Sequence, residues 1–286
     1  CLWGIWDKPG SPVKADMTYK FPNFSVNLVL SDLPIPVAPF RSVQNAPNAF
    51  ATESFIDEMA NLAGKDPLNF RLESLTDNMR SRRVLESVAL NSDWGKPLPK
   101  NWGRGIAQHS SFGTTIAQVA EVSVDPKTGY VQVHRVDVAV DCGPVVNPDP
   151  LEAQIQGAVA LGVSTTLFEE VQFANGGVSS ANFGDYRILR MSENPEVNVH
   201  VIKSDEEIGG IGEPGIMPLA PAVANYSLTE MLDKTRPNGD SYRSDDLFNG
   251  PALNCGFIPD DELENGDLRL QVRLSDIINI IMDIEG

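Results

Sequence analysis

Alternation of apolar and polar residues is strongest between residues 116 and 140, where it predicts a β-hairpin. The segment between Asp125 and Gly129 has the composition of a turn. The alternation changes phase between Val133 and Val136, which predicts a β-bulge or a change of face. The apolar positions on the two sides of the turn are Ala117, Val119, Val122 and Val124, then Val131, Val133, Val136, Val138 and Val140.

Spacings of three to four residues predict a helix after residue 48. Asn48 is its candidate N-cap, and Gly64 is placed to end it. The residues expected to face the core are Phe55, Met59, Leu62 and Ala63.

Shorter signals complete an α+β arrangement of mixed sheets and packed helices. Asp66-Pro67 predicts the start of a second helix, a third is expected around residues 84–90, and a fourth runs from Asp149-Pro150 to Leu161. Strands are expected within residues 19–30 and over 197–201, and Asn175-Gly176-Gly177 predicts another hairpin.

In the fourth helix, Gln154 and Gly157 share a face. A glycine is costly there, so either tight packing or the close approach of a ligand is expected.

Composition narrows the class of protein. The 286 residues are 42% hydrophobic and 21% charged, which is typical of a soluble globular chain with a substantial core. The net charge of −17 argues against nucleic acid or an anionic membrane as the partner, because both attract clustered Lys and Arg. No apolar run reaches the length of a membrane span.

The residues that usually hold metals are sparse. Three cysteines, Cys1, Cys142 and Cys255, lie far apart without the spacing of an iron–sulfur or zinc site. The three histidines are also isolated from one another in the sequence. No metal ligand is therefore assigned to this chain.

The glycine-rich stretch from Gly209 to Gly215 contains one carboxylate, Glu213. Glycines allow positive φ or a close approach of the backbone. Pro214 biases Glu213 towards an extended conformation just before an apolar segment that is a candidate helix. A carboxylate fixed beside apolar residues is a candidate general base. The alternative is an ordinary solvated glutamate in a surface loop.

The character of the chain changes after Asn225. Residues 1–225 form the expected domain, and residues 226–286 form an acidic C-terminal tail that contains Asp245-Asp246 and Asp260-Asp261-Glu262. Position 1 is Cys rather than Met, so we expect the sequence to be part of a longer or processed chain.

Four sequence motifs follow one another between residues 19 and 225. They are PFRSV at 39–43 with residues 48–58, residues 103–122, residues 141–157, and residues 182–191 with Gly-Glu-Pro-Gly at 212–215. Together they resemble the xanthine dehydrogenase/aldehyde oxidase family, and most closely the large (beta) subunit of the isoquinoline 1-oxidoreductase type. The resemblance covers the second, C-terminal molybdenum-cofactor-binding domain, and it does not extend to residues 226–286.

The resemblance implies roles for five residues. Glu213 matches the family's active-site base, which takes a proton from the oxygen that attacks the substrate. Arg41 matches a loop arginine that faces the substrate. Gln154 matches a glutamine that hydrogen-bonds the pterin, and Gly157 and Gly212 match positions at the cofactor.

The resemblance also implies a cofactor and partners. The cofactor is molybdopterin, with the cytosine dinucleotide as one candidate form. The partners are an iron–sulfur (2Fe-2S) small subunit, the N-terminal half of the molybdenum subunit, and a small aldehyde or N-heterocycle. Water supplies the oxygen atom. The family's Gln-Gly cofactor loop is not found in this sequence, so we expect the isolated chain to be inactive.

Three hypotheses are left open at this point. The chain is part of a molybdenum hydroxylase, a catalytically inactive fragment or interaction module without cofactor, or a carboxylate-based hydrolase. The last would need a second acid near Glu213, for which Asp205, Glu206 and Glu207 are the nearest candidates in the sequence. Family members of this type occur in the bacterial periplasm or cytoplasm, and the sequence does not choose between these locations.

Overall fold

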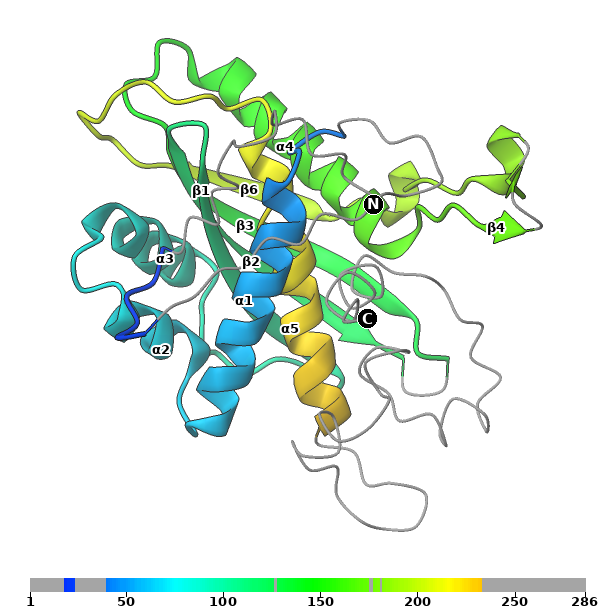
Figure 1. Ribbon diagram of the computed structural model, residues 1–286, viewed down its shortest axis with the longest axis horizontal. Coiled ribbons are helices and arrows are strands. Elements are labelled where there is room, and N and C mark those ends of the chain that lie inside the picture. The colour runs from blue at the N-terminus through cyan, green and yellow to red at the C-terminus, as the bar shows by residue number, and fades with distance from the viewer. Residues whose placement is uncertain (1–17, 24–39, 126–127, 175–176, 181, 233–286) are drawn as a thin grey trace.

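A four-stranded mixed sheet forms the centre of the molecule (Figure 1). The computed structural model describes residues 18–23, 40–125, 128–174, 177–180 and 182–232. The strands are β1 (Trp102–Ser111), β2 (Thr114–Val124), β3 (Val131–Asp141) and β6 (Glu196–Val201), in the order β1-β2-β3-β6. The first three are antiparallel neighbours, whereas β6 runs parallel to β3. This confirms the α+β class with a mixed sheet.

The predicted hairpin and its irregularity are both present in β2 and β3. Arg135 pairs with Glu121, but Val133 pairs with Val122, so His134 is the extra residue of a β-bulge. The bulge returns Val133 to the same buried cluster as Val136, despite the change of phase in the sequence. The His134 ring stacks on Trp102 with its centroid 3.7 Å away. The tip of the turn, residues 126–127, lies outside the described residues.

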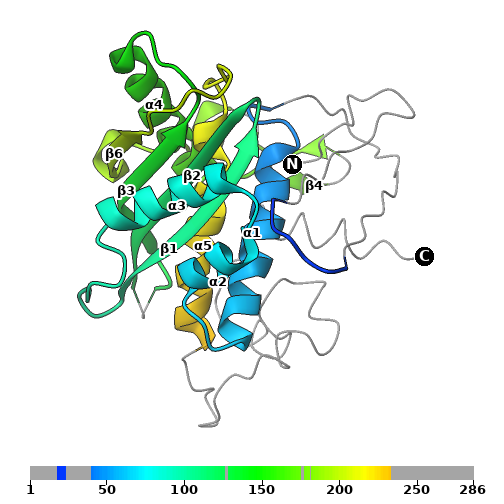
Figure 2. The ribbon, with the colours of Figure 1, turned by 90° about the vertical axis from the view of Figure 1, so that its left-hand side faces the viewer.

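Helices cover both faces of the sheet. Helix α3 (Met79–Asn91) packs on one face, and α4 (Pro148–Leu167) and α5 (Leu219–Leu232) pack on the other (Figure 2). Helix α1 (Asn45–Leu62) lies beside α5 and contacts β1, and α2 (Pro67–Ser74) joins it to α3. Strands β1, β2 and β3 send alternate side chains into the two cores, and this alternation gives β2 and β3 the period-two pattern of the predicted hairpin.

The side of α1 that faces the core differs from the prediction. Phe55 and Leu62 are 56% and 63% exposed, whereas Ile56 and the charged Glu53 are buried. The helix also begins earlier, after Gln44, so Asn48 is not its N-cap. The predicted end is right, because Gly64 has φ 63° directly after the helix. Apolar spacing misplaced this face because the buried side carries a charge.

Two helix starts were predicted correctly. Asp66 accepts a hydrogen bond from the Asn69 amide at 3.0 Å, and Pro67 is the first residue of α2. Asn147 caps α4 by accepting from the Asp149 amide at 3.2 Å. Helix α4 continues to Leu167, beyond the predicted end, and Gly162 within it allows close contact with Leu219, the first residue of α5.

Short elements connect α4 to β6. The predicted hairpin consists of β4 (Phe173–Ala174) and β5 (Gly177–Val178), whose turn residues 175–176 lie outside the described part of the chain. Two 3₁₀ turns follow, η1 (Phe183–Asp185) and η2 (Met191–Glu193). A third, η3 (Pro214–Ile216), precedes α5.

Other predictions fall partly outside the described residues. Residues 18–23 contain no strand, and the remainder of the strand expected within 19–30 is not described. The boundary proposed at residue 225 stays a prediction, since α5 continues to Leu232 and residues 233–286 are not described. Strand β1 was not predicted from the pattern at all.

Candidate active site

The loop that carries Glu213 returns from β6 across the ends of β1, β2 and β3. Its backbone is held from outside the loop: the Gly209 amide donates to the Cys142 carbonyl at 2.9 Å, and the Gly210 amide donates to the Phe112 carbonyl at 2.7 Å. The Thr114 hydroxyl donates to the Gly210 carbonyl at 2.7 Å. Two separate segments, the β1–β2 turn and the residue after β3, therefore fix the loop just before Glu213.

The glycines of this loop are needed because the backbone packs closely against its neighbours, and not because it adopts a positive φ. None of the four glycines between residues 209 and 215 has φ in the left-handed region. A Cβ on Gly209 would lie 2.4 Å from the Gly113 carbonyl oxygen, and one on Gly215 would lie 2.7 Å from the Ala158 Cβ. The loop can lie against the β1–β2 turn and α4 only because these side chains are absent.

Gln118 fixes the turn that follows Glu213. It is fully buried on β2, and its Nε2 donates to the Gly215 carbonyl at 2.7 Å. Gln118 belongs to one of the four family motifs, at residues 103–122. The sequence does not predict its contact with Gly215, because the two residues are 97 positions apart.

Four of the five residues expected at the site lie together. The Arg41 Nε donates to the Gly212 carbonyl at 2.8 Å, and its Nη2 donates to the same oxygen. The Gln154 Nε2 donates to that oxygen at 3.1 Å. Glu213 follows directly, and its Oε2 accepts from the Ser42 amide at 2.7 Å.

The conformation of Glu213 differs from the extended one that was expected. Its φ and ψ are −123° and −30°, and its carbonyl accepts from the Ile216 amide at 3.1 Å. Pro214 begins η3 immediately afterwards and is buried. Glu213 is thus the last residue before the helical segment. The hydrogen bond to its carbonyl and the buried proline that follows fix the position of its Cα, and so the origin of its side chain.

The face of α4 next to this loop is open. Gln154 and Gly157 are exposed, and a Cβ added to Gly157 would meet no atom within 4 Å. In the described part of the chain, the Gln154 Oε1 accepts no hydrogen bond. An amide oxygen beside an uncovered glycine fits the approach of a flat polar group such as a pterin edge.

The acids proposed as partners of Glu213 lie in other contacts. The Glu206 carboxylate lies 3.6 Å from Arg83, and the Glu207 backbone packs against Gly143. Among the described residues, no hydrogen bond joins Glu213 to another acid. The arrangement of two facing carboxylates required for the hydrolase hypothesis is therefore not seen in that part of the chain.

A buried charged network lies elsewhere, behind α1. The Glu53 carboxylate accepts from Arg71 Nε at 2.9 Å, from the Tyr19 hydroxyl at 2.6 Å and from the Gln108 amide at 3.1 Å. Arg71 also donates to Asp57. Burial is the main cause that raises the pKa of Tyr19 well above its usual value, and Glu53 adds to it. This network was missed because Arg71 is one polar residue in a short helix.

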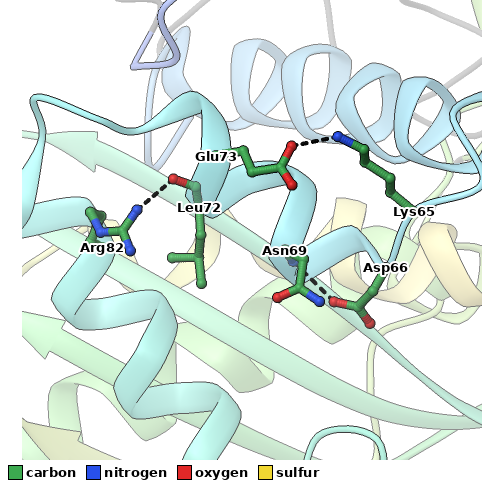
Figure 3. A pocket seen from close by; sticks show the side chains of 6 residues that line it. All are labelled: Lys65, Asp66, Asn69, Leu72, Glu73 and Arg82. Carbon is green, nitrogen blue, oxygen red and sulfur yellow. Dashed lines mark hydrogen bonds and ion pairs between the residues drawn. The ribbon is translucent and has the colours of Figure 1, made fainter.

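A cavity among the described residues has no part in this site. It is a depression of about 450 Å³ around α2 (Figure 3). Its lining is mostly charged and already paired, with Lys65 2.6 Å from Glu73 and Asp66 capping α2. The lining residues are Lys65, Asp66, Asn69, Leu72, Glu73 and Arg82. We assign it no binding function.

The described residues contain neither a cluster of metal-binding side chains nor a helix suited to the membrane. No group of three or more His, Cys, Asp or Glu side chains in that part of the chain is arranged to hold a metal ion. None of the described helices combines the length and apolar character needed to cross a bilayer.

Comparison with known proteins defines the class. Residues 64–195 match the family model of the molybdopterin cofactor-binding domain. The beta subunit of isoquinoline 1-oxidoreductase from Brevundimonas diminuta is 32% identical over 220 residues, which cover 76% of this chain and 28% of that protein. These residues are therefore part of a molybdopterin cofactor-binding domain, and the chain belongs to the xanthine dehydrogenase/aldehyde oxidase family, which confirms the resemblance.

One further relative and one solved structure of similar fold add to this picture. A protein from Gluconacetobacter polyoxogenes, named a membrane-bound aldehyde dehydrogenase with pyrroloquinoline quinone, is 36% identical over 65% of this chain and 26% of its own length. The aldehyde oxidoreductase from Desulfovibrio gigas has the same fold over 66% of this chain and 39% of its own, with a TM-score of 0.55 and 12% identity. The chain spans about a quarter of the length of the two sequence relatives.

Proposed function

We propose that this chain is the second cofactor-binding domain of a molybdenum hydroxylase that oxidises an aldehyde or an N-heterocycle with water as the oxygen source. The observation that carries the proposal is the convergence of Arg41, Gln154, Gly212 and Glu213. These residues come from segments up to 171 positions apart, and each matches a position of the family motifs. The names of the relatives, which include isoquinoline and aldehyde enzymes, support the two classes of substrate.

Glu213 is the proposed general base. Its partly buried carboxylate starts from a rigid turn, and it accepts a proton from the oxygen nucleophile as that oxygen attacks the electron-poor carbon. A molybdopterin cofactor, when bound, supplies the oxidation itself by accepting two electrons from the substrate. The protein then has two further roles: it positions the reacting groups, and it stabilises the charge that develops as they react.

Gln154, Gly157 and Gly212 are the proposed cofactor contacts. Gln154 can offer its Oε1 to the pterin while its Nε2 stays on the Gly212 carbonyl. Gly157 leaves room for the ring system. The cytosine dinucleotide form of the cofactor is part of the proposal, as is an iron–sulfur small subunit that takes up the electrons.

Arg41 is proposed to act at the substrate side of the loop. Two of its nitrogens already donate to the Gly212 carbonyl, so its fixed planar head is held beside Glu213. A guanidinium in that place can stabilise the negative charge that develops on a substrate oxygen or ring nitrogen. The earlier half of the molybdenum subunit is the proposed partner that completes the pocket, and we propose that the isolated chain is inactive without it.

The deciding experiment replaces Glu213 with Gln in the cofactor-loaded holoenzyme. General-base loss predicts a decrease in kcat of about a thousandfold, with molybdenum content unchanged. Glu207→Gln is the matched control, because Glu207 is exposed in the same loop, and it should keep wild-type turnover. Metal analysis of the purified enzyme also separates molybdopterin from a quinone cofactor. Turnover that survives in Glu213→Gln, or an active enzyme without molybdenum, would overturn the proposal.

A further inference from the structure

The turn that precedes α1 has an unusual backbone. Ser42 and Val43 have φ of 89° and 49°, in the region that side-chain-bearing residues rarely adopt. They are consecutive, and Ser42 is fully buried. Such a conformation persists only where surrounding contacts impose it.

Asn45 supplies much of that constraint. Its backbone amide and its side-chain Nδ2 donate to the same Ser42 carbonyl, at 2.9 and 3.1 Å. The Val43 amide donates to the Phe40 carbonyl at 2.9 Å, which closes the turn. The Asn45 Oδ1 lies 3.3 Å from Nε2 of His109 on β1, and this contact orients the amide. The turn is therefore tied both to its own helix and to the sheet.

The constrained turn presents one backbone group to the site. The Ser42 amide donates to Glu213 Oε2 at 2.7 Å, a short distance for a nitrogen donor and typical of a hydrogen bond to a carboxylate. The Ser42 hydroxyl, by contrast, is buried and finds no partner within the described residues. The side chain thus does not explain the strained conformation, whereas the direction of the amide does.

The two oxygens of Glu213 differ as a result. Oε2 is held by Ser42, and in the described part of the chain Oε1 accepts no hydrogen bond. A hydrogen-bonded carboxylate oxygen has one donor already aligned with it, so the other oxygen is the better placed to receive a new proton.

We propose that the left-handed Ser42 turn is a positioning device that holds Glu213 Oε2 and thereby makes Oε1 the proton-accepting oxygen. In the step, a proton leaves the oxygen nucleophile and forms an O–H bond at Oε1, and the nucleophile keeps the electron pair. Ser42 and Asn45 act through Glu213 and do not touch the substrate. The role of Glu213 as base rests on the proposed function, but the hydrogen bond from Ser42 does not.

The first test uses NMR of the 286-residue chain labelled with ¹⁵N-serine, without cofactor. The Ser42 amide signal, assigned by its loss in Ser42→Gly, should move in Glu213→Gln, because the amide then donates to a neutral amide oxygen instead of a carboxylate. The same signal should keep its wild-type position in Glu207→Gln. A Ser42 signal that ignores Glu213 would overturn the inference and leave the proposed function standing.

The second test measures turnover in the cofactor-loaded holoenzyme. Asn45→Ala removes one of the two donors that hold the Ser42 carbonyl, and kcat should fall about tenfold with KM little changed, because the base is misaligned and binding is not. Asn91→Ala is the matched control, since it removes a bond of 2.8 Å from an asparagine Nδ2 to the Ser87 carbonyl on an exposed helix surface.

A rescue separates positioning from a purely structural effect. Glycine adopts φ near 89° without strain, so Ser42→Gly in the Asn45→Ala background should recover part of kcat, although it adds flexibility to the chain. Unchanged kcat in Asn45→Ala, or no recovery in the double variant, would contradict a positioning role. Turnover that survives in Glu213→Gln would instead remove the proposed function, while the NMR result would still decide the Ser42 contact.

Discussion

Two carboxylates of this protein are held by backbone and side-chain donors, but to different extents. Glu53, 1% exposed, receives donors on both oxygens: Tyr19 on Oε1, and Arg71 and the Gln108 amide on Oε2. Glu213 is partly exposed, and only its Oε2 receives a donor among the described residues. A carboxylate whose lone pairs are all used can stabilise a fold, whereas one with a free oxygen can also take part in proton transfer.

The surroundings of the two residues differ in the same way. Around Glu53 the packing is closed, and even the neighbouring strand needs a glycine at position 105 to let α5 approach. Around Glu213 the face of α4 is left open at Gln154 and Gly157. Closed packing indicates a structural region, whereas the uncovered polar face next to the Glu213 carboxylate is consistent with the proposed cofactor contact.

Of the substitutions that test this comparison, Glu53→Gln should lower stability most. Glu53→Gln replaces an acceptor oxygen with an NH₂ group that faces the donors of Arg71 and Gln108. It also removes one of the two negative charges that balance the buried charge of Arg71. We expect the free energy of unfolding to fall by about 3–5 kcal/mol, the usual cost of breaking a buried pair. Urea denaturation measures this, with the exposed Glu73→Gln as control.

Glu213→Gln should change the free energy of unfolding by less than about 1 kcal/mol, because a Gln Oε1 can still accept from Ser42. If Glu213→Gln were as destabilising as Glu53→Gln, the distinction between a structural carboxylate and the proposed catalytic one would fail.

Gly105→Ala should be the next most harmful change. Its Cβ would lie 2.0 Å from the Ala222 carbonyl oxygen, so β1 and α5 would have to separate. We expect a loss of about 3 kcal/mol in the free energy of unfolding, as for other overpacked cores. Gly184→Ala, where no atom lies within 4 Å, is the control. Equal stability of the two variants in thermal unfolding would show that the β1–α5 contact is looser than described.

Glu58 is a third kind of carboxylate, and it makes stability depend on pH. It is partly buried on α1, and within the described residues no donor reaches it. Burial, followed by the charge of Asp57, raises the pKa of Glu58 from 4.5 to about 7. The folded state therefore binds the proton more tightly than the unfolded state. The stabilisation is complete below the unfolded pKa and is lost as the pH rises through about 7.

Glu58→Gln should remove this dependence. We expect the variant to gain on the order of 2 kcal/mol over the wild type at about pH 8 and little at about pH 4. Urea denaturation at the two values measures it, with Glu86→Gln, which carries an exposed pair with Arg82, as the control. A wild-type stability that rises with pH in this range would mean that an unseen donor stabilises the Glu58 carboxylate.

Gly157→Ala should have the smallest effect on the fold. It should raise the stability of the protein but weaken binding of the cofactor. No atom lies within 4 Å of the added Cβ, and alanine favours the helix, so the free energy of unfolding should rise by about 0.5–1 kcal/mol. If a cofactor lies against this glycine, the holoenzyme should retain less molybdenum. Ala160→Gly on the same helix should lower stability by a similar amount and leave molybdenum unchanged. Full molybdenum content in Gly157→Ala would place the cofactor elsewhere.

Much of the fold could be predicted because its signals are local. The β2–β3 hairpin, its bulge, the cap at Asp66, the start of α4 near Asp149-Pro150 and the end of α1 near Gly64 all depend on neighbours within a few residues. Strand β1 and the buried face of α1 could not be read in this way. Their interior positions include Gln108 and Glu53, whose burial is possible only because partners from other elements satisfy them.

The sequence by itself determined the family, the hairpin and the set of residues that meet near Glu213, because motif order and short-range periodicity are properties of the chain. Only the tertiary structure decided how those residues are held. Ser42 is 171 positions from Glu213, and its amide, a group that every residue except proline possesses, leaves no mark in the sequence. Which backbone groups aim at a side chain depends on φ and ψ imposed by distant contacts, and these exist only once the chain has folded.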